Sequence, residues 1–140
     1  MSALFLLPLT EEKVLKLFAQ CFNRADFEPV IARLSRKAAY ESWNNFYHYR
    51  GRESVTKVLR ERSEKLQVSQ LGERAYLGFM SVQRSFADTK HLVHCVCLSE
   101  GDPNNVTGLV RIRFTPLHIQ RIDIIQAATH HYTRGDDAGT

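Results

Sequence analysis

Residues 37–67, KAAYESWNNFYHYRGRESVTKVLRERSEKLQ, contain the change of pattern that decides the fold. From Lys37 to Phe46 side chains alternate with a period of two and aromatic residues are frequent, which predicts a strand. Gly51 interrupts this pattern, and over residues 53–67 the apolar side chains recur at helical spacing, with Glu and Lys four positions apart. The stretch therefore predicts a strand followed closely by an amphipathic helix.

Upstream of this stretch the sequence predicts two further helices. Thr10 can cap the first, because its hydroxyl oxygen can accept a hydrogen bond from an N–H group of the first turn. Apolar residues then recur at helical spacing as far as Asn23. Asp26 and Pro29 mark the start of a second, short helix, since proline is well tolerated in a first turn.

Downstream of Gly72 the pattern is one of strands separated by short turns. The predicted strands are 75–86, 90–99, 106–115 and 118–127. Short loops between long strands predict an antiparallel meander, and strands of this length twist and curve as they pack on helices. We expect one α+β domain over residues 1–128, with N-terminal helices packed on a strongly curved mixed or antiparallel sheet. Residues 129–140 are expected to form a mobile C-terminal tail.

The composition narrows the classes of partner. The 140 residues carry 19 Lys and Arg against 15 Asp and Glu, and the net charge of +4 is spread along the chain. Nucleic acid binding usually leaves a clustered basic surface, so no nucleic acid partner is expected. No segment approaches the roughly 20 apolar residues of a membrane-spanning helix, and no membrane association is expected. Three cysteines do not make a disulfide framework, and free thiols fit a protein of the reducing cytoplasm.

Short motifs accompany this order of helix, short helix, strand, helix and four-strand meander. They are Ile31-Ala32-Arg33-Leu34, Ala39-Tyr40-Glu41-Ser42-Trp43, Tyr49-x-Gly51-x-Glu53-Ser54-Val55 and Leu59. The arrangement resembles the nuclear transport factor 2-like superfamily, whose fold is a cystatin-like cone, and in particular its SnoaL-like members. The resemblance implies a curved sheet wrapped around helices to leave a deep, largely apolar pocket, and commonly a homodimer through the outer sheet face. Members include isomerases of the ketosteroid isomerase-like type, dehydratases, cyclases and epoxide hydrolases, and also noncatalytic binding or docking domains.

Three side chains are candidates for catalysis in such a pocket, because apolar walls shift the pKa of an ionisable group. Asp123 can act as a general base positioned by Arg121, or the two can form an exposed ion pair on the strand. His94 stands alone on an apolar face, either as a hydrogen-bonded core histidine or as a proton-transfer group. Tyr40 can donate a hydrogen bond to a substrate oxygen, or pack with its hydroxyl at the rim.

The predicted pocket lining and function follow from the same resemblance. We expect the pocket to be lined by Trp43, Arg84, Phe79, Met80 and Phe114. The expected function is to bind a small hydrophobic or carbonyl-bearing molecule, with cofactor-free proton transfer of the isomerase, dehydratase or hydrolase kind. The alternative is a noncatalytic docking module for a partner protein, in which the protein's own side chains, such as Phe79, Met80 and Trp43, fill the interior.

No metal ion or organic cofactor is expected. His91, His94, Cys95 and Cys97 include the residue types that bind zinc. On a strand, however, His94 points away from both cysteines, and no second pair stands at the spacing of a zinc finger. The sequence also contains no Gly-rich phosphate loop and no serine nucleophile elbow.

Overall fold

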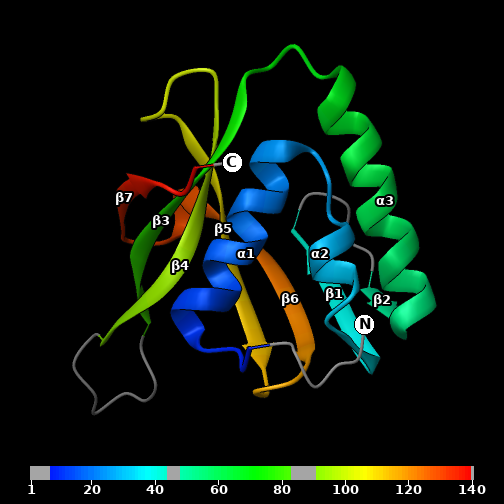
Figure 1. Cartoon of the computed structure of the whole chain (residues 1–140). Helices are drawn as coiled ribbons and strands as arrows, with labels where there is room; N and C mark the ends of the chain where they lie inside the picture. Colours follow the sequence, from blue (N-terminus) through cyan, green and yellow to red (C-terminus); the bar gives the residue numbers. More distant parts are fainter. Residues whose placement is uncertain (1–6, 44–47, 83–90, 140) are drawn as a thin grey trace.

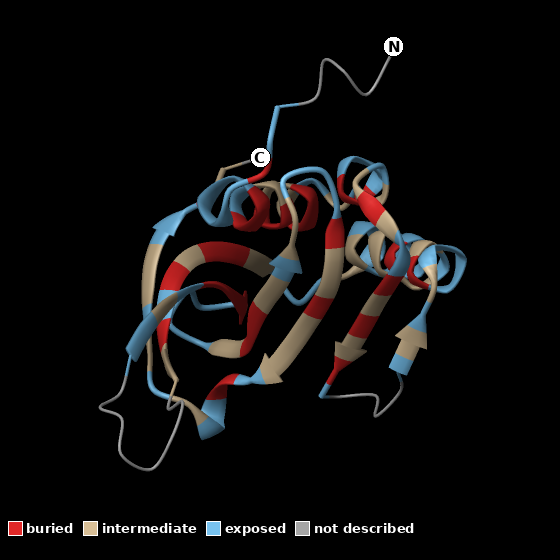
Figure 2. Ribbon diagram, turned by 90° about the horizontal axis from the view of Figure 1, so that it is seen from below, coloured by how far each residue is buried: buried red, intermediate tan, exposed pale blue. Residues whose placement is uncertain are grey.

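In the computed structural model, which describes residues 7–43, 48–82 and 91–139, seven strands form one mixed sheet and three α-helices lie on one of its faces (Figure 1). We call the face that contacts the helices the inner face and the opposite one the outer face. The strands curve beneath the helices, which lie at the top of Figure 2. The predicted α+β architecture, with helices on a curved mixed sheet, is confirmed.

The helices begin and end where their sequences indicate. Helix α1 spans Glu11–Arg24, and the Thr10 hydroxyl accepts a hydrogen bond of 3.3 Å from the backbone N–H of Lys13. Helix α2 is a single turn, Glu28–Ile31, with proline near its start. Helix α3 spans Arg52–Val68 and follows Gly51, whose φ of +90° favours glycine. None of the helices in the described part of the chain is long and apolar enough to cross a membrane.

The strands follow the order β2-β1-β6-β5-β4-β3-β7 across the sheet. Their bounds are β1 Leu34–Ser42, β2 His48–Arg50, β3 Glu73–Val82, β4 His91–Glu100, β5 Val106–Phe114, β6 Ile119–Gln126 and β7 Tyr132–Asp137. All neighbours are antiparallel except β1 and β6, which run parallel with Tyr40 beside Ile122 and Glu41 beside Asp123. The predicted meander is confirmed as β3 to β6. The parts of the predicted strands at 44–46 and 83–86 lie outside the described residues.

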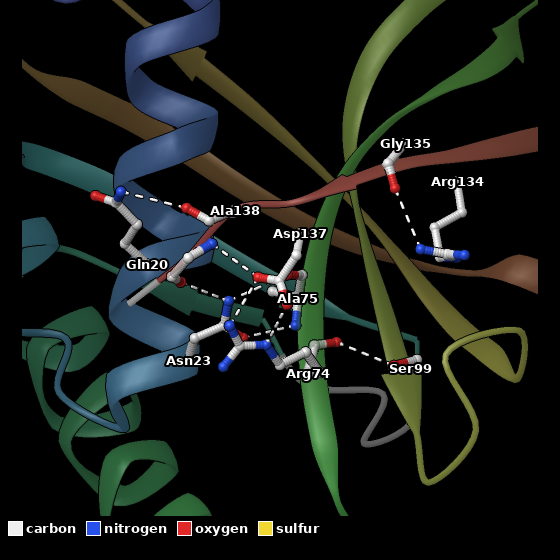
Figure 3. Close-up of polar contacts among 10 residues, drawn as sticks. Gln20, Asn23, Arg74, Ala75, Ser99, Arg134, Gly135, Asp137 and Ala138 are labelled. Carbon is white, nitrogen blue, oxygen red and sulfur yellow. Dashed lines mark hydrogen bonds and ion pairs between the residues drawn. The ribbon is translucent and has the colours of Figure 1, made fainter.

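The expectation of a mobile tail from residue 129 is wrong for residues 132–137. They form β7, which pairs antiparallel with the edge strand β3. Arg74 on β3 makes a bidentate ion pair with Asp137 on β7, with N–O distances of 2.9 and 2.7 Å (Figure 3). A polar segment thus joins the sheet because backbone pairing and this ion pair hold it there.

Helix α1 also holds the end of the chain. The Asn23 side-chain amide donates hydrogen bonds to the backbone oxygens of Ala75 and Gly139, at 3.1 and 2.9 Å. Its oxygen accepts a bond of 2.7 Å from the N–H of Ala75. Gln20, one turn earlier, donates to the oxygen of Ala138 at 3.3 Å, as Figure 3 shows. One asparagine therefore links α1, β3 and the residues after β7.

The alternation of the strands produces a separate apolar cluster on each face of the sheet. The larger cluster lies between the helices and the inner face, and it includes Phe18 and Phe27 of the helical layer with Val96 and Val110 of the sheet. The smaller cluster lies on the outer face. Its buried members are Tyr76, Met80, Cys95, Cys97, Leu109 and Ala127, with Tyr132 packed against them. The chain after β6 therefore covers part of the outer face.

Candidate functional site

A cavity of about 480 Å³ lies between α3 and the inner face of the sheet. Strands β1, β4, β5 and β6 and the start of β3 contribute to its walls, together with residues of α1, α3 and β2. We call it the inner cavity. Its aromatic lining consists of Phe22, Tyr40, Trp43 and Tyr49, and further apolar surface comes from Val58, Leu98 and Ile124. The volume falls in the range of pockets that hold small molecules.

Tyr40 is the most buried polar group among the aromatic residues of the inner cavity, with 5% of its surface exposed. Its ring packs edge to face with that of Tyr49, with the centroids 6.1 Å apart. Burial raises the pKa of Tyr40 to about 12, because the charged phenolate loses its hydration, although nearby Arg62 and a hydrogen bond with Ser42 act in the opposite direction. Tyr40 is therefore a neutral phenol at physiological pH and can donate a hydrogen bond.

A charged pair faces the same cavity. Arg62 of α3 donates a hydrogen bond of 3.1 Å to the carboxylate of Glu73, the first residue of β3. The Glu73 side chain is only 10% exposed, and the Arg62 guanidinium lies over the ring of Phe22, 5.6 Å from its centroid. The arrangement brings a carboxylate, a guanidinium and a phenol to one hollow whose lining is mixed, with aromatic, aliphatic and charged side chains.

Sequence reasoning missed Arg62 and Glu73, although one signal was present. Val55, Val58 and Leu59 mark the apolar stripe of α3, and Arg62 continues that stripe three residues after Leu59. A cation on the buried face of an amphipathic helix indicates a partner or a cavity. Glu73 carries no comparable signal, because its burial results from the packing of α3 against the sheet.

Asp123 does not share a site with Tyr40, and the combination of the two in one pocket is wrong. Tyr40 and Ile122 lie beside each other and face inward, so Glu41, Arg121 and Asp123 face outward. The Arg121 Nε donates to both oxygens of Asp123 at 2.9 and 3.0 Å, and Arg121 also pairs with Glu41. The structure therefore brings Asp123 and Arg121 together, as an ion pair on the outer face.

His94 lies on the surface, so the expected core position is wrong. It is exposed, and its ring packs against Phe79 directly across from it on β3, with the ring centroids 4.5 Å apart. Phe79 is itself 41% exposed. Neither residue lines the inner cavity. Alternation along the strands turns both side chains toward the inner face. The β3–β4 hairpin, however, extends beyond the helices, which do not cover its end (Figure 1).

The other predicted pocket residues have different positions. Trp43 lines the inner cavity. Met80 faces outward and is buried in the smaller cluster, because its parity on β3 is opposite to that of Phe79. Phe114 packs against the inner cluster at the end of β5, whereas the cavity is lined by Thr107 and Gly108 at the start of that strand. Arg84 lies outside the described residues.

The described residues contain no group of three or more His, Cys, Asp or Glu side chains that could hold a metal ion. The inner cavity offers hydrogen-bond donors and carboxylates inside aromatic walls. Such a set can bind and orient an organic molecule and exchange a proton with it.

Comparisons with solved structures identify the fold. The chain is similar to a nuclear transport factor 2-like protein of unknown function from Cytophaga hutchinsonii, at 16% identity and a TM-score of 0.51, over 82% of this chain and 97% of that one. A second such protein, from Mesorhizobium loti, is 11% identical with a TM-score of 0.55, over 83% and 89%. A de novo designed protein with a curved β-sheet is 18% identical with a TM-score of 0.52, over 86% and 90%.

No protein-family model and no curated protein sequence matches this chain. Its likeness to the solved structures is one of fold, because the identities are low. The predicted cone-shaped fold, which these nuclear transport factor 2-like proteins share, is confirmed.

Proposed function

From the nuclear transport factor 2-like fold of this chain we infer a small-molecule-binding protein, whose ligand occupies the inner cavity and accepts a hydrogen bond from Tyr40. The supporting observation is a neutral phenol, almost fully buried, that lines a hollow of about 480 Å³. The Tyr40 hydroxyl, which hydrogen-bonds with Ser42, can donate its proton to a ligand oxygen, and such a hydrogen bond contributes about 0.5–1.5 kcal/mol.

The lining defines the chemical class of the ligand. The aromatic and aliphatic side chains favour a flat molecule with an apolar part, the charged side chains favour polar groups on the same molecule, and Tyr40 favours a carbonyl, phenol or ether oxygen. The noncatalytic alternative expects an interior filled by Phe79, Met80 and Trp43. Phe79 is exposed and Met80 belongs to the other face, so these two cannot fill it, and we favour the ligand-binding function.

We extend the proposal to proton transfer without a cofactor. Glu73 is the carboxylate with the geometry of a base, since its hydrogen bond with Arg62 fixes its position at the cavity wall. In this mechanism Glu73 removes a proton from the carbon next to a carbonyl, and Tyr40 stabilises the negative charge that develops on the oxygen. Glu73 then returns the proton to the product. This role replaces the one predicted for Asp123 and His94.

The chain contains its own probe of binding. Trp43 is the only tryptophan of the sequence and lines the cavity, so its fluorescence should change when a ligand enters. We expect aromatic ketones to bind, and Tyr40→Phe to weaken their binding at least tenfold while leaving a matched hydrocarbon without oxygen unaffected. Tyr76→Phe, on the outer face, is the control variant. Equal affinities of the wild type and Tyr40→Phe for the ketone would contradict the proposal.

Proton transfer has a separate readout. In D₂O the protein should catalyse deuterium incorporation at the carbon next to the carbonyl of a bound ketone, followed by NMR. Glu73→Gln should abolish this exchange while Trp43 still reports binding, because glutamine keeps the shape of the side chain and loses the basic oxygen. If the wild type binds the ketone but does not catalyse the exchange, the proposed proton transfer is contradicted and the proposed ligand binding stands.

We also propose that two copies associate through the outer face. Across the sheet, Glu41, Asp123 and Arg111 lie side by side in one row, acidic toward β1 and basic toward β5. Among the described residues neither Arg111 nor Arg113 has a carboxylate within ion-pair distance. A two-fold axis near β6 would bring the basic half of one copy onto the acidic half of the other.

Sedimentation velocity tests this association. The wild type should sediment as a dimer, and the double variant Arg111→Glu with Arg113→Glu as a monomer. Arg52→Glu, an exposed residue at the start of α3, changes the charge elsewhere and should leave the dimer intact. A monomeric wild type at high protein concentration would contradict the proposal.

We assign the protein to a reducing compartment such as the cytoplasm. Its three cysteines are buried and unpaired, and Cys95 and Cys97 lie close together without a disulfide.

A further inference from the structure

Two carboxylates face each other in the wall of the inner cavity. Glu73 on β3 and Glu100 on β4 are directly opposite in the strand register, and both line the cavity. The N–H of Gly101 donates to the oxygen of Gly72, and this hydrogen bond makes the adjacent glutamate pair one of the non-hydrogen-bonded kind. In such antiparallel pairs the Cα atoms are only about 4.5 Å apart and the side chains are closest. The fold thus brings two like charges together.

Only one of the two carboxylates has a cation beside it. Arg62 donates its hydrogen bond of 3.1 Å to Glu73. Across the described ranges 7–43, 48–82 and 91–139, no Lys, Arg or His side chain lies within ion-pair distance of the Glu100 carboxylate. Like charges directly opposite each other destabilise a sheet. A cation from outside the chain that lies beside Glu100 would therefore be stabilising.

The other charges of the lining do not alter this balance. They are Glu61 and Lys65 of α3, which are both exposed and lie four residues apart on one face of the helix. Opposite charges at this spacing attract each other, and the surrounding water screens both. The less exposed part of the cavity contains the neutral pair of Arg62 with Glu73, and Glu100. It therefore carries one uncompensated negative charge.

The aromatic lining also suits a positively charged ligand. The rings of Tyr40, Trp43 and Tyr49 line the same cavity. The face of an aromatic ring attracts a cation, and proteins use this attraction to bind quaternary ammonium groups. The chain itself shows it, since the Arg62 guanidinium lies over the ring of Phe22. The cavity therefore combines an unpaired carboxylate with aromatic rings.

We propose that the ligand of the inner cavity carries an organic ammonium group, which binds beside Glu100. This inference rests on the ligand binding proposed above, and it narrows the class from ketones in general to amino ketones. The apolar part of the ligand packs along the aromatic lining, and its carbonyl oxygen accepts the hydrogen bond from Tyr40. A metal ion would supply charge without using the apolar lining, and the described residues offer no group of three or more His, Cys, Asp or Glu side chains to hold one.

A pair of ligands that differ only in charge tests the inference. Phenacyltrimethylammonium and neopentyl phenyl ketone have the same shape, and the first has a positively charged nitrogen where the second has a carbon. Isothermal titration calorimetry of the full chain should give a dissociation constant at least tenfold lower for the ammonium compound. Equal affinities, or tighter binding of the neutral ketone, would overturn the inference and leave the proposed function in place. Binding of neither compound would overturn both.

Variants assign the effect to Glu100. Glu100→Gln keeps the shape of the side chain, and should remove the advantage of the ammonium compound without changing the affinity for the neutral ketone. Glu64→Gln changes the net charge equally at an exposed position outside the cavity lining, and should retain the advantage. Glu100→Gln should also melt at a higher temperature than the wild type, because the repulsion from Glu73 is removed. A lower melting temperature, or an undiminished preference for the ammonium compound, would overturn the inference.

Discussion

Arg62 donates a hydrogen bond of 3.1 Å to Glu73, and this ion pair joins α3 to the first residue of β3 at the wall of the inner cavity. The carboxylate is largely buried, so the pair differs from the exposed ion pair between Arg60 and Glu28 on the far side of the same helix. The two pairs offer a matched comparison of buried and exposed charge.

Removal of Arg62 should destabilise the fold. Arg62→Met keeps most of the aliphatic length but leaves Glu73 without its partner, and we expect the free energy of unfolding to fall by about 1–3 kcal/mol. Arg60→Met should have no measurable effect, because both members of that pair are in contact with water. Urea denaturation measures both variants. Equal losses would mean that burial of Glu73 does not decide the energy of the pair.

Tyr40 should make the stability of the fold depend on alkaline pH. Burial raises its pKa from 10.0 to about 12, so between these values the folded state binds more protons than the unfolded state. The contribution of Tyr40 to the free energy of unfolding is therefore fully present below pH 10. It falls by about 2–3 kcal/mol as the pH rises to about 12. Urea denaturation across this range should give a shallower fall for Tyr40→Phe than for the wild type. Identical slopes for the wild type and Tyr40→Phe would mean that the pKa of Tyr40 is not raised above 10.0 in the folded protein.

The link between Asn23 and the end of the chain should protect β7 from solvent. Asn23→Ala removes three hydrogen bonds, to Ala75 twice and to Gly139 once, and should lower the free energy of unfolding by roughly 2–3 kcal/mol. Hydrogen exchange should show protected amides in β7 of the wild type and faster exchange in the variant. Gln20→Ala loses one longer bond and serves as the milder control. Unprotected amides at 132–137 in the wild type would show that this segment is mobile, as the sequence predicts.

Two glycines of the sheet should respond oppositely to alanine. At Gly78 a Cβ would stand 2.5 Å from the Thr133 oxygen and 2.7 Å from the Cys97 sulfur, so Gly78→Ala should displace β7 and destabilise the fold by about 1–3 kcal/mol or more. At Gly108 the nearest atom would be 3.4 Å away, so Gly108→Ala should cost little. Thermal unfolding compares the two. A tolerated Gly78→Ala would show that β7 packs more loosely than described.

Local patterns were sufficient to predict the helices and the meander. The start of α1 is marked by Thr10 and the apolar stripe that follows it. The start of α3 is marked in the same way by Gly51 and the stripe after it, so each signal lies close by in the sequence. Strand β7 has no such signal, because Tyr132–Asp137 is polar. It becomes a strand through pairing with β3 and the ion pair of Asp137 with Arg74, and the next residues are held by Asn23. The three-residue β2 is too short to produce an alternating pattern.

The candidate site was predicted only in part for a related reason. Alternation places Tyr40 and Glu41 on opposite faces, but only the parallel register with β6 shows that Asp123 shares the face of Glu41. The exposed position of His94 depends on how far α1 reaches along the β3–β4 hairpin, which is a property of packing. Glu73 likewise becomes part of a cavity only when α3 lies across the start of its strand.

The edges of the sheet restrict how the protein can assemble. One margin is β2, with three residues, and the other is β7, which pairs with Arg74 and is followed by residues bonded to α1. Margins of three and six residues offer an incoming strand only short stretches of backbone to pair with, so continuous cross-molecular sheets are disfavoured. Native oligomers of this chain should consequently form by stacking of surfaces, and amyloid-like growth should first require release of the C-terminal strand.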